Sequence, residues 1–204
     1  MCSIVIKRLF DITGSVIALV LLAIPMLLVA VAIRLESRGP AIFRQRRAGR
    51  RGKPFTMLKF RTMHSDVEPY GGSPHSGRDP RLTRIGRFLR ETSLDELPQL
   101  LNVLSDQMSL VGPRPLYQRQ TEQWNEFQQR RLETKPGITG YAQAYGRAGL
   151  TIEDKIEMDV HYVNNCNFWL DLQIIVRTTV NMFVRRGTVY EQRYSRDREH
   201  ESDT

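Results

Sequence analysis

The feature that most restricts how this chain can fold is an apolar run near its N-terminus. Ile12–Ile33 spans twenty-two residues without a charge, and Val16–Ile33 contains no polar side chain. A straight helix of that length is about 33 Å long, enough to cross the hydrocarbon core of a bilayer. A signal peptide fits less well, because the run is long and no small-residue cleavage site follows it. The sequence therefore predicts a helix embedded in a membrane.

Two features of this run bear on whether the helix crosses the membrane or enters and returns. Pro25 lies near its middle, where it removes a backbone hydrogen bond and kinks the helix. Basic residues flank both ends, Lys7 and Arg8 before the run and Arg34 and Arg38 after it, and basic flanks prefer the cytoplasmic side. A re-entrant helix bent at Pro25 keeps both flanks on that side. We therefore favour the re-entrant helix, with a kinked spanning helix as the alternative.

The positive charge of the chain is concentrated just after this run. Thirty Lys and Arg against 22 Asp and Glu give +8 overall, and residues 34–61 hold ten Lys or Arg and one acid, a local charge of +9. Such a block indicates a solvated face or an anionic partner, either nucleic acid or a lipid surface. One hypothesis is therefore a membrane-anchored basic module that binds anionic lipid or nucleic acid without catalysis. The sequence has no basic motif with interleaved aromatic residues that would support nucleic acid as the partner.

The composition predicts one folded domain behind the membrane segment. A hydrophobic content of 41% excludes a disordered chain, and Cys2 and Cys166 show neither metal-ligand spacing nor a disulfide framework. The predicted fold class is α+β and mainly helical. We divide the chain into a re-entrant membrane hairpin (1–38), a cytoplasmic domain (39–190) and a disordered tail (191–204).

Local patterns place the elements of that domain. Glycines between two apolar arms predict a β-hairpin over Ala41–Met63, and residues 64–80 predict a mobile loop. Helices are predicted over Arg81–Leu89, Leu94–Leu104, Tyr117–Glu133, Thr151–Asn164 and Trp169–Arg186, and a Gly-rich loop over Lys135–Arg147. In the last helix apolar residues recur every three or four positions. This stripe is typical of a core-facing helix, but beside an embedded segment an amphipathic interfacial helix gains weight.

The candidate catalytic residues lie in the segment Arg90–Gln107. Ser93 followed by Glu96 has the pattern of a capping box, which predicts a helix start with Asp95 and Glu96 in its first turn. Backbone N–H groups there favour negative charge, so Asp95 should stay ionised at neutral pH and could attack phosphorus. Two adjacent carboxylates at a phosphate site also suggest Mg²⁺. Ordinary capping explains an acidic first turn as well, but Pro98 inside the predicted helix breaks a local rule, as functional sites often do.

Basic side chains around this motif are candidates for binding phosphate. Arg90 precedes the predicted helix by one turn, Arg114 lies in a stiff Pro-rich turn, and Arg147 ends the Gly-rich loop. A guanidinium held by a tight turn suits phosphate, although each of these residues alone is more simply a surface Arg. Lys59 and Asp171 could pair and orient the site. The four His are scattered and receive no role.

Five motifs occur in order along the chain and cover about residues 7–186. They are KRLFDITGSVIALVLLAIP (Lys7–Pro25), FTMLKFRTM (Phe55–Met63), SLDELPQLLNVL (Ser93–Leu104), MSLVGPRPL (Met108–Leu116) and KPGITGYAQAYGR (Lys135–Arg147). Together they resemble the bacterial sugar transferases, the monotopic phosphoglycosyl transferases. The short chain resembles the minimal catalytic form of that family.

The resemblance implies a reaction. In that family a phosphosugar moves from a UDP-sugar to polyprenol (undecaprenyl) phosphate at the cytoplasmic face of the bacterial inner membrane, and UMP leaves. This is the first membrane step in the synthesis of glycoconjugates such as O-antigen, capsule, exopolysaccharide or glycoprotein glycans. The sequence does not name the sugar or the pathway, and it leaves the oligomeric state open, a homodimer included.

The resemblance also implies roles for individual residues. Asp95 matches the nucleophile that forms an aspartyl-phosphosugar intermediate, and Glu96 matches its partner, with Mg²⁺ required. Arg114 matches a phosphate-binding Arg, and Arg147 one implicated at the nucleotide. Pro25 matches the break of a re-entrant helix, so that the implied protein is monotopic.

Overall fold

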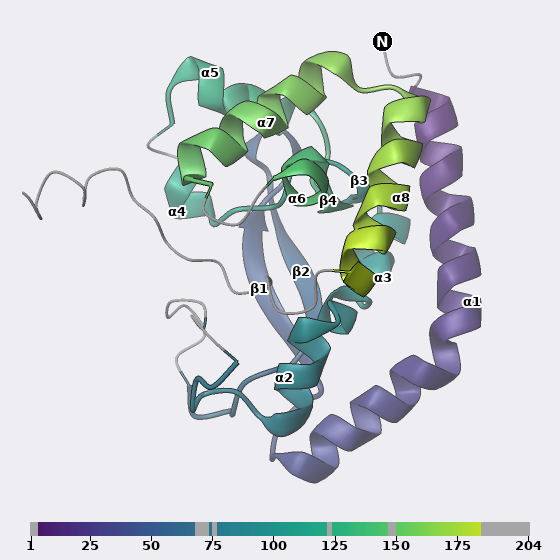
Figure 1. Cartoon of the computed structure of the whole chain (residues 1–204), viewed down its shortest axis with the longest axis vertical. Helices are drawn as coiled ribbons and strands as arrows, with labels where there is room; N and C mark the ends of the chain where they lie inside the picture. The colour runs from purple at the N-terminus through teal and green to yellow at the C-terminus, as the bar shows by residue number, and fades with distance from the viewer. Residues whose placement is uncertain (1–3, 68–73, 75–76, 122–123, 147–149, 185–204) are drawn as a thin grey trace, which may run out of the picture.

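The computed structural model describes residues 4–67, 74, 77–121, 124–146 and 150–184. Its longest element is the helix α1 (Ile4–Glu36), which continues through Pro25 and lies along one side of the molecule (Figure 1). The helix is visibly bent, as expected where a proline removes the hydrogen bond to the preceding turn. By length and composition α1 could cross a membrane. The predicted apolar helix with Pro25 inside it is therefore confirmed.

The rest of the described chain forms two small sheets, several short helices and, last in order, two longer helices. In order these elements are β1 (Ile42–Ala48), the 3₁₀ turn η1 (Arg50–Gly52), β2 (Pro54–Phe60), α2 (Arg84–Glu91), the 3₁₀ turn η2 (Leu94–Glu96), α3 (Gln99–Leu104), β3 (Ser109–Val111), α4 (Gln118–Thr121), α5 (Glu126–Gln129), the 3₁₀ turn η3 (Arg130–Glu133), β4 (Gly137–Thr139), α6 (Tyr141–Tyr145), α7 (Ile152–Asn165) and α8 (Phe168–Val184). β1 and β2 pair antiparallel, whereas β3 and β4 pair parallel. The predicted mainly helical α+β class and the β-hairpin are confirmed.

Both ends of α1 are attached to the same folded body. Near its start, Lys7 Nζ lies 2.6 Å from Asp171 Oδ2 on α8. At its end, the carboxylate of Glu36 accepts a hydrogen bond of 2.7 Å from the backbone N–H of Arg84, in the first turn of α2. Ile33 is buried in one apolar cluster with residues of β2 and α2. The two ends of the apolar helix are therefore held by polar contacts and by packing on one domain.

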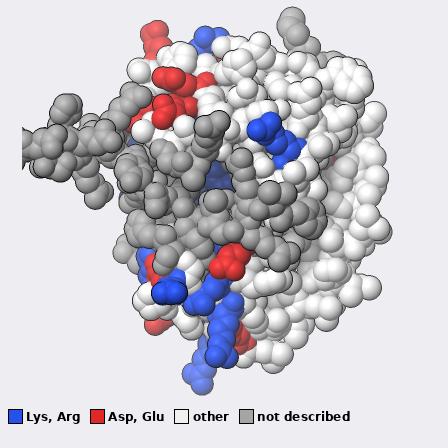
Figure 2. Space-filling model, viewed as in Figure 1, with Lys and Arg blue, Asp and Glu red and all other residues white. Residues whose placement is uncertain are grey.

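Between these ends, α1 presents apolar side chains outward. Val20, Leu21 and Ile24 are each 72% exposed. On α8, Trp169 and Val176 of the predicted stripe are also exposed, while the opposite face of that helix is buried. The side of the molecule along α1 accordingly shows almost no charge (Figure 2). The core-facing interpretation of the α8 stripe is therefore wrong, and its exposure matches an interfacial helix beside a membrane-associated one.

Two other segments differ from their predictions. The polar stretch predicted as one helix over Tyr117–Glu133 is divided, because Asn125 starts the new helix α5 with a capping box to Gln128. The segment predicted as a Gly-rich loop over Lys135–Arg147 contains β4 and α6. Residues 68–73 and 75–76 of the predicted loop, Arg147 and the tail 191–204 lie outside the described residues.

Candidate active site

The carboxylate pair lies in η2, the 3₁₀ turn between α2 and α3. Ser93, predicted to cap a helix, has φ 57°, in the left-handed region, and its side chain makes no capping hydrogen bond. The α-helix begins only at Gln99, with Pro98 at its N-cap, where a missing N–H breaks no helical hydrogen bond. A helical turn does start after Ser93, as predicted, but it is the 3₁₀ turn η2 without the predicted capping box. The prediction of one continuous helix with Pro98 in its interior is wrong. The left-handed conformation of Ser93 strains the backbone next to the carboxylates, at a cost of roughly 1–3 kcal/mol.

Glu96 is held by two cations that come from different parts of the chain. Lys59 Nζ of β2 lies 2.7 Å from Glu96 Oε1, and Arg114 Nη2 lies 3.0 Å from the same oxygen. Burial opposes ionisation of Glu96, but the charges of Arg114 and Lys59 outweigh it and lower the pKa of Glu96 to about 2. Glu96 is therefore an anion at physiological pH, and it holds Lys59 and Arg114 close to Asp95.

Asp95 has a contrasting environment. It is 8% exposed, and burial raises its pKa to about 6, with Lys59 opposing the rise and the charge of Glu96 adding to it. Arg90 and Arg114 also favour its ionised form. Within the described part of the chain its carboxylate accepts no hydrogen bond. With a pKa of about 6, Asp95 is mostly ionised at neutral pH, but burial raises that pKa, whereas the predicted backbone N–H groups would have lowered it. No donor of the described residues bonds its oxygens.

The pair therefore consists of two adjacent carboxylates whose pKa values are driven apart. Such a separation is typical of groups with different chemical roles. Glu96, fixed by two cations, is suited to positioning. Asp95, poorly solvated and weakly engaged, is suited to react with an electrophile such as phosphorus.

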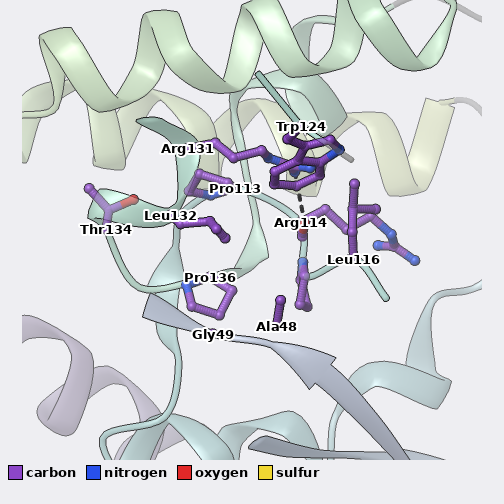
Figure 3. Close-up of a pocket in the computed structure, with 11 residues that line it drawn as sticks. Ala48, Gly49, Pro113, Arg114, Leu116, Trp124, Arg131, Leu132, Thr134 and Pro136 are labelled. Carbon is purple, nitrogen blue, oxygen red and sulfur yellow. Dashed lines mark hydrogen bonds between the residues drawn. The ribbon is translucent and has the colours of Figure 1, made fainter. Parts of the chain in front are cut away.

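The turn that carries Arg114 is fixed by close contact between two glycines. A Cβ on Gly112 would lie 2.3 Å from the carbonyl oxygen of Lys135, and one on Gly137 would lie 2.1 Å from the nitrogen of Gly112. Any larger residue would therefore push these segments apart. Figure 3 shows Arg114 in this turn, between the end of β1 and Arg131.

The structure brings most of the predicted phosphate-binding residues to one place. Lys59 and Arg114 contact Glu96 directly, and Arg90, in the last turn of α2, favours the ionised form of Asp95 electrostatically. Lys59 lies on the β-hairpin, Arg114 in the Pro-rich turn and Arg90 on α2. The site therefore has the positive charge that a diphosphate substrate requires.

One predicted pairing is wrong. Asp171 does not contact Lys59, because Lys59 is bound to Glu96 instead. Asp171 accepts hydrogen bonds from Lys7 Nζ and from the Tyr162 hydroxyl, each of 2.6 Å. Asp171 therefore holds the start of α1, through Lys7, and does not orient Lys59.

Sequence reasoning missed a buried ion pair next to the Pro-rich turn. Arg131 of η3 and Asp159 of α7 bind each other, with side chains only 4% and 3% exposed. The signal was present in the sequence, because Asp159 shares a helical face with Ile156 and Val160, and a charge on an apolar face requires a buried partner.

The donor set at the site suits a divalent cation that arrives with a phosphate substrate. Among the described residues no cluster of three or more His, Cys, Asp or Glu side chains could hold a metal by itself. Mg²⁺, however, is commonly bound by one or two carboxylates together with substrate phosphates and waters. Asp95 and Glu96 supply carboxylates of this kind.

Comparison with known proteins gives a consistent result. The model of the family described as bacterial sugar transferase matches residues 2–185. The chain is 45% identical over 183 residues to the uncharacterized sugar transferase EpsL of Bacillus subtilis, which covers 90% of both chains. It is 42% identical over 185 residues to a UDP-glucose:undecaprenyl-phosphate glucose-1-phosphate transferase of Caulobacter vibrioides, covering 86% of this chain and 69% of that protein. It is 40% identical over 190 residues to a transferase of the same name from Escherichia coli, but spans only 41% of that longer protein.

Proposed function

The chain belongs to the bacterial sugar transferase family, and from this premise we propose that it is a phosphoglycosyl transferase. The proposed reaction moves a phosphosugar from a UDP-sugar to polyprenol phosphate and yields polyprenol-diphosphate-sugar and UMP. The observation that carries the proposal is the contrast between Asp95 and Glu96: Glu96 is fixed by Lys59 and Arg114, while the buried Asp95 has no hydrogen-bond donor among the described residues.

In the proposed first step Asp95 is the nucleophile. One of its carboxylate oxygens attacks the phosphorus that bears the sugar, forming an aspartyl-phosphosugar. The bond from that phosphorus to the oxygen bridging the two phosphates breaks, and UMP leaves with the electron pair. Arg114, whose side chain is 39% exposed, can stabilise the charge that develops on the phosphoryl oxygens.

In the proposed second step the polyprenol phosphate takes the place of UMP. An oxygen of its phosphate attacks the same phosphorus, the bond to Asp95 breaks, and the carboxylate is regenerated. Division into two steps lets two unlike substrates, a nucleotide sugar and a lipid, use one nucleophile in turn. Each step exchanges one phosphorus–oxygen bond for another and needs no redox partner.

We propose Mg²⁺ as the cofactor, held by Asp95 and Glu96 together with oxygens of the substrate. When bound, the ion would neutralise part of the diphosphate charge and polarise the phosphoryl oxygens. In this assignment Lys59 fixes Glu96 so that the carboxylate pair faces the substrate as a unit.

The proposed location is the cytoplasmic face of the bacterial inner membrane, in a monotopic arrangement. The attachment of both ends of α1 to one body, through Lys7 and Glu36, supports a helix that enters the bilayer and returns. A single body cannot hold both ends if they lie on opposite sides of a bilayer core about 30 Å thick. We propose that the exposed apolar residues of α1 and α8 enter the membrane and that the active site lies near the lipid headgroups, where a polyprenol phosphate presents its charge.

The test is an assay of the purified full chain in lipid nanodiscs with polyprenol phosphate, Mg²⁺ and a panel of UDP-sugars. We expect UMP release with at least one UDP-sugar, and loss of that release on chelation of Mg²⁺ or in the Asp95→Asn variant. The matched control is Glu157→Gln, an acid on the exposed face of α7. It should retain activity.

Omitting the acceptor should trap the phosphosugar on the protein. Mass spectrometry of peptides is then expected to find it on Asp95. A phosphosugar on another side chain, or normal turnover by Asp95→Asn, would refute the assigned nucleophile. Failure with every UDP-sugar, together with tight, salt-sensitive binding of RNA, would favour the non-catalytic basic module instead.

A further inference from the structure

We propose that Arg131 is a positioning residue that, with Asp159, fixes Arg114 at the carboxylate pair. This inference rests on the proposed function, because it assigns how that active site is held. Arg131 lies in η3 and Asp159 in α7, and neither belongs to the segments that carry Asp95 and Glu96.

The contact that supports this role runs through the main chain of Arg114. Arg131 Nη2 donates a hydrogen bond of 2.9 Å to the carbonyl oxygen of Arg114, a contact that Figure 3 shows as a dashed line. The same nitrogen binds Asp159 Oδ2. The Cζ atom of the Arg131 guanidinium also lies 5.1 Å from the centre of the Trp124 ring. The Arg131 guanidinium is thus held by the Asp159 carboxylate and the Trp124 ring in the position from which it bonds the Arg114 carbonyl.

The turn needs such a contact because of its sequence. Pro113 and Pro115 have no N–H, so neither can donate a backbone hydrogen bond to fix the residue between them. The turn is instead held through its carbonyl oxygens, by bonds from Gly137 N to Pro113, from Arg131 Nη2 to Arg114, from Arg47 Nη1 to Pro115 and from Ala48 N to Leu116. Arg131 supplies the bond at the residue whose side chain reaches Glu96.

The burial of this ion pair indicates that it serves to position Arg114 more than to stabilise the fold. Both side chains are almost fully buried, and two buried charges gain little net stability over apolar residues of similar size. A buried guanidinium does, however, provide a rigid planar donor, which Lys cannot replace. Displacement of a catalytic contact by about 1 Å can lower a rate by up to about a hundredfold.

The experiment is a double-mutant cycle on the rate of UMP release from UDP-sugar in the absence of acceptor. Arg131→Lys keeps the charge beside Asp159 but is too short to reach the Arg114 carbonyl. We expect it to lower the rate by about tenfold to a hundredfold in the native background and by less than about threefold when Arg114 is already Ala. The matched control Arg130→Lys, on the exposed side of the same 3₁₀ turn, should leave the rate unchanged.

Equal losses in both backgrounds would overturn the inference, since they would mean that Arg131 acts independently of Arg114. If Arg131→Lys does not fold, Asp159→Asn serves in its place and should show the same non-additivity. A structure of the variant provides a readout that does not depend on activity, with loss of the contact between Arg114 and Glu96 expected and its retention contradicting the proposal. A native protein that releases no UMP would refute the proposed function, and the variant structure alone would then decide this inference.

Discussion

Lys59 and Glu96 are separated by 37 residues in the sequence and joined by a contact of 2.7 Å between Nζ and Oε1. This contact ties the second strand of the hairpin to the turn that carries Asp95. Because Arg114 binds the same Glu96 oxygen, three separate segments meet at one carboxylate. The charge state of Asp95 next to it therefore depends on residues that are distant in the sequence.

The first prediction concerns the pH dependence of the nucleophile. Burial raises the pKa of Asp95 to about 6, and only its ionised form can attack phosphorus. At limiting Mg²⁺, the single-turnover rate of UMP release without acceptor should therefore be constant above that pKa and fall about tenfold per pH unit below it, and the acid limb should move to lower pH as Mg²⁺, which favours the ionised carboxylate, is raised. Omitting the acceptor matters, because a polyprenol phosphate monoester titrates in the same range. A rate that stays constant down to pH 5 would contradict the assignment.

The second prediction tests Lys59 as the source of the favourable charge. Lys59 lowers the pKa of Asp95, so Lys59→Met should move the acid limb of the rate profile to higher pH. Lys59→Arg retains the charge and should leave the limb near its native position. The rate with Met should also fall at high pH, because Glu96 loses one of its two ion-pair partners. An unmoved acid limb in Lys59→Met would show that this charge does not act on Asp95.

The third prediction links the site to stability. The pKa of Asp95 is about 6 in the folded protein against an ordinary value of 3.8, so the folded state binds the proton more tightly than the unfolded state. Stability is therefore lost as pH rises from about 4 to about 6, and the full cost of the buried charge is present at neutral pH. Asp95→Asn should remove this cost and stabilise the protein at pH 7 by between about 1 and 3 kcal/mol.

Thermal unfolding in detergent at several pH values measures this difference. The Asn variant should unfold several degrees above the native protein at pH 7, and the gap should narrow as the pH falls and close below about pH 3, where Asp95 is protonated in both states. If the variant is less stable than the native protein at pH 7, the ionised carboxylate of Asp95 stabilises the folded state instead of destabilising it, and the prediction is wrong.

The residue types at the site could be predicted from the sequence, but their contacts could not. The Asp95–Glu96 pair and the cations Lys59, Arg90 and Arg114 were identified from motif and charge, and the structure brings these residues together. Which acid Lys59 binds depends on how the hairpin packs. Phe55 and Met57 of β2 bury themselves against residues around α3, which brings Lys59 to Glu96 instead of Asp171.

The local conformation around the pair was mispredicted for a related reason. Ser93 and Glu96 have the spacing of a capping box, yet Glu96 is bound by Lys59 and Arg114 and does not reach back to the backbone. Tertiary ion pairs outweigh a capping interaction worth about 1 kcal/mol. Where cations from other segments surround a carboxylate, local capping patterns therefore lose their predictive value.

The fourth prediction concerns the anchor at the start of α1. Asp171 is 3% exposed and pairs with Lys7, so Lys7→Met leaves a buried carboxylate without its cation. Loss of one partner of a buried pair typically costs about 3–5 kcal/mol, and the variant should unfold at markedly lower temperature. The double variant Lys7→Met with Asp171→Leu removes both charges and should recover much of the loss. Lys53→Met, an exposed control, should have no effect.

Failure of the double variant to recover would show that the pair contributes more than mutual neutralisation. The single hydroxyl proton of Tyr162 has two acceptors within reach, Asp171 Oδ1 at 2.6 Å and the carbonyl oxygen of Val111 at 3.2 Å, so the hydroxyl can still donate to Val111 when Asp171 is replaced.

The last prediction decides the topology of α1. In a background with Cys2→Ser and Cys166→Ser, single cysteines are introduced as Val5→Cys and Arg38→Cys, beside the two ends that are bonded to the folded body. A membrane-impermeant maleimide should label both from the same side of inside-out vesicles and neither from the other side. Val20→Cys, in the 72% exposed middle of the apolar helix, should react from neither side because lipid covers it. Labelling of the two ends from opposite sides would establish a spanning helix, and the polar contacts of Lys7 and Glu36 with one domain could not then both exist in the membrane.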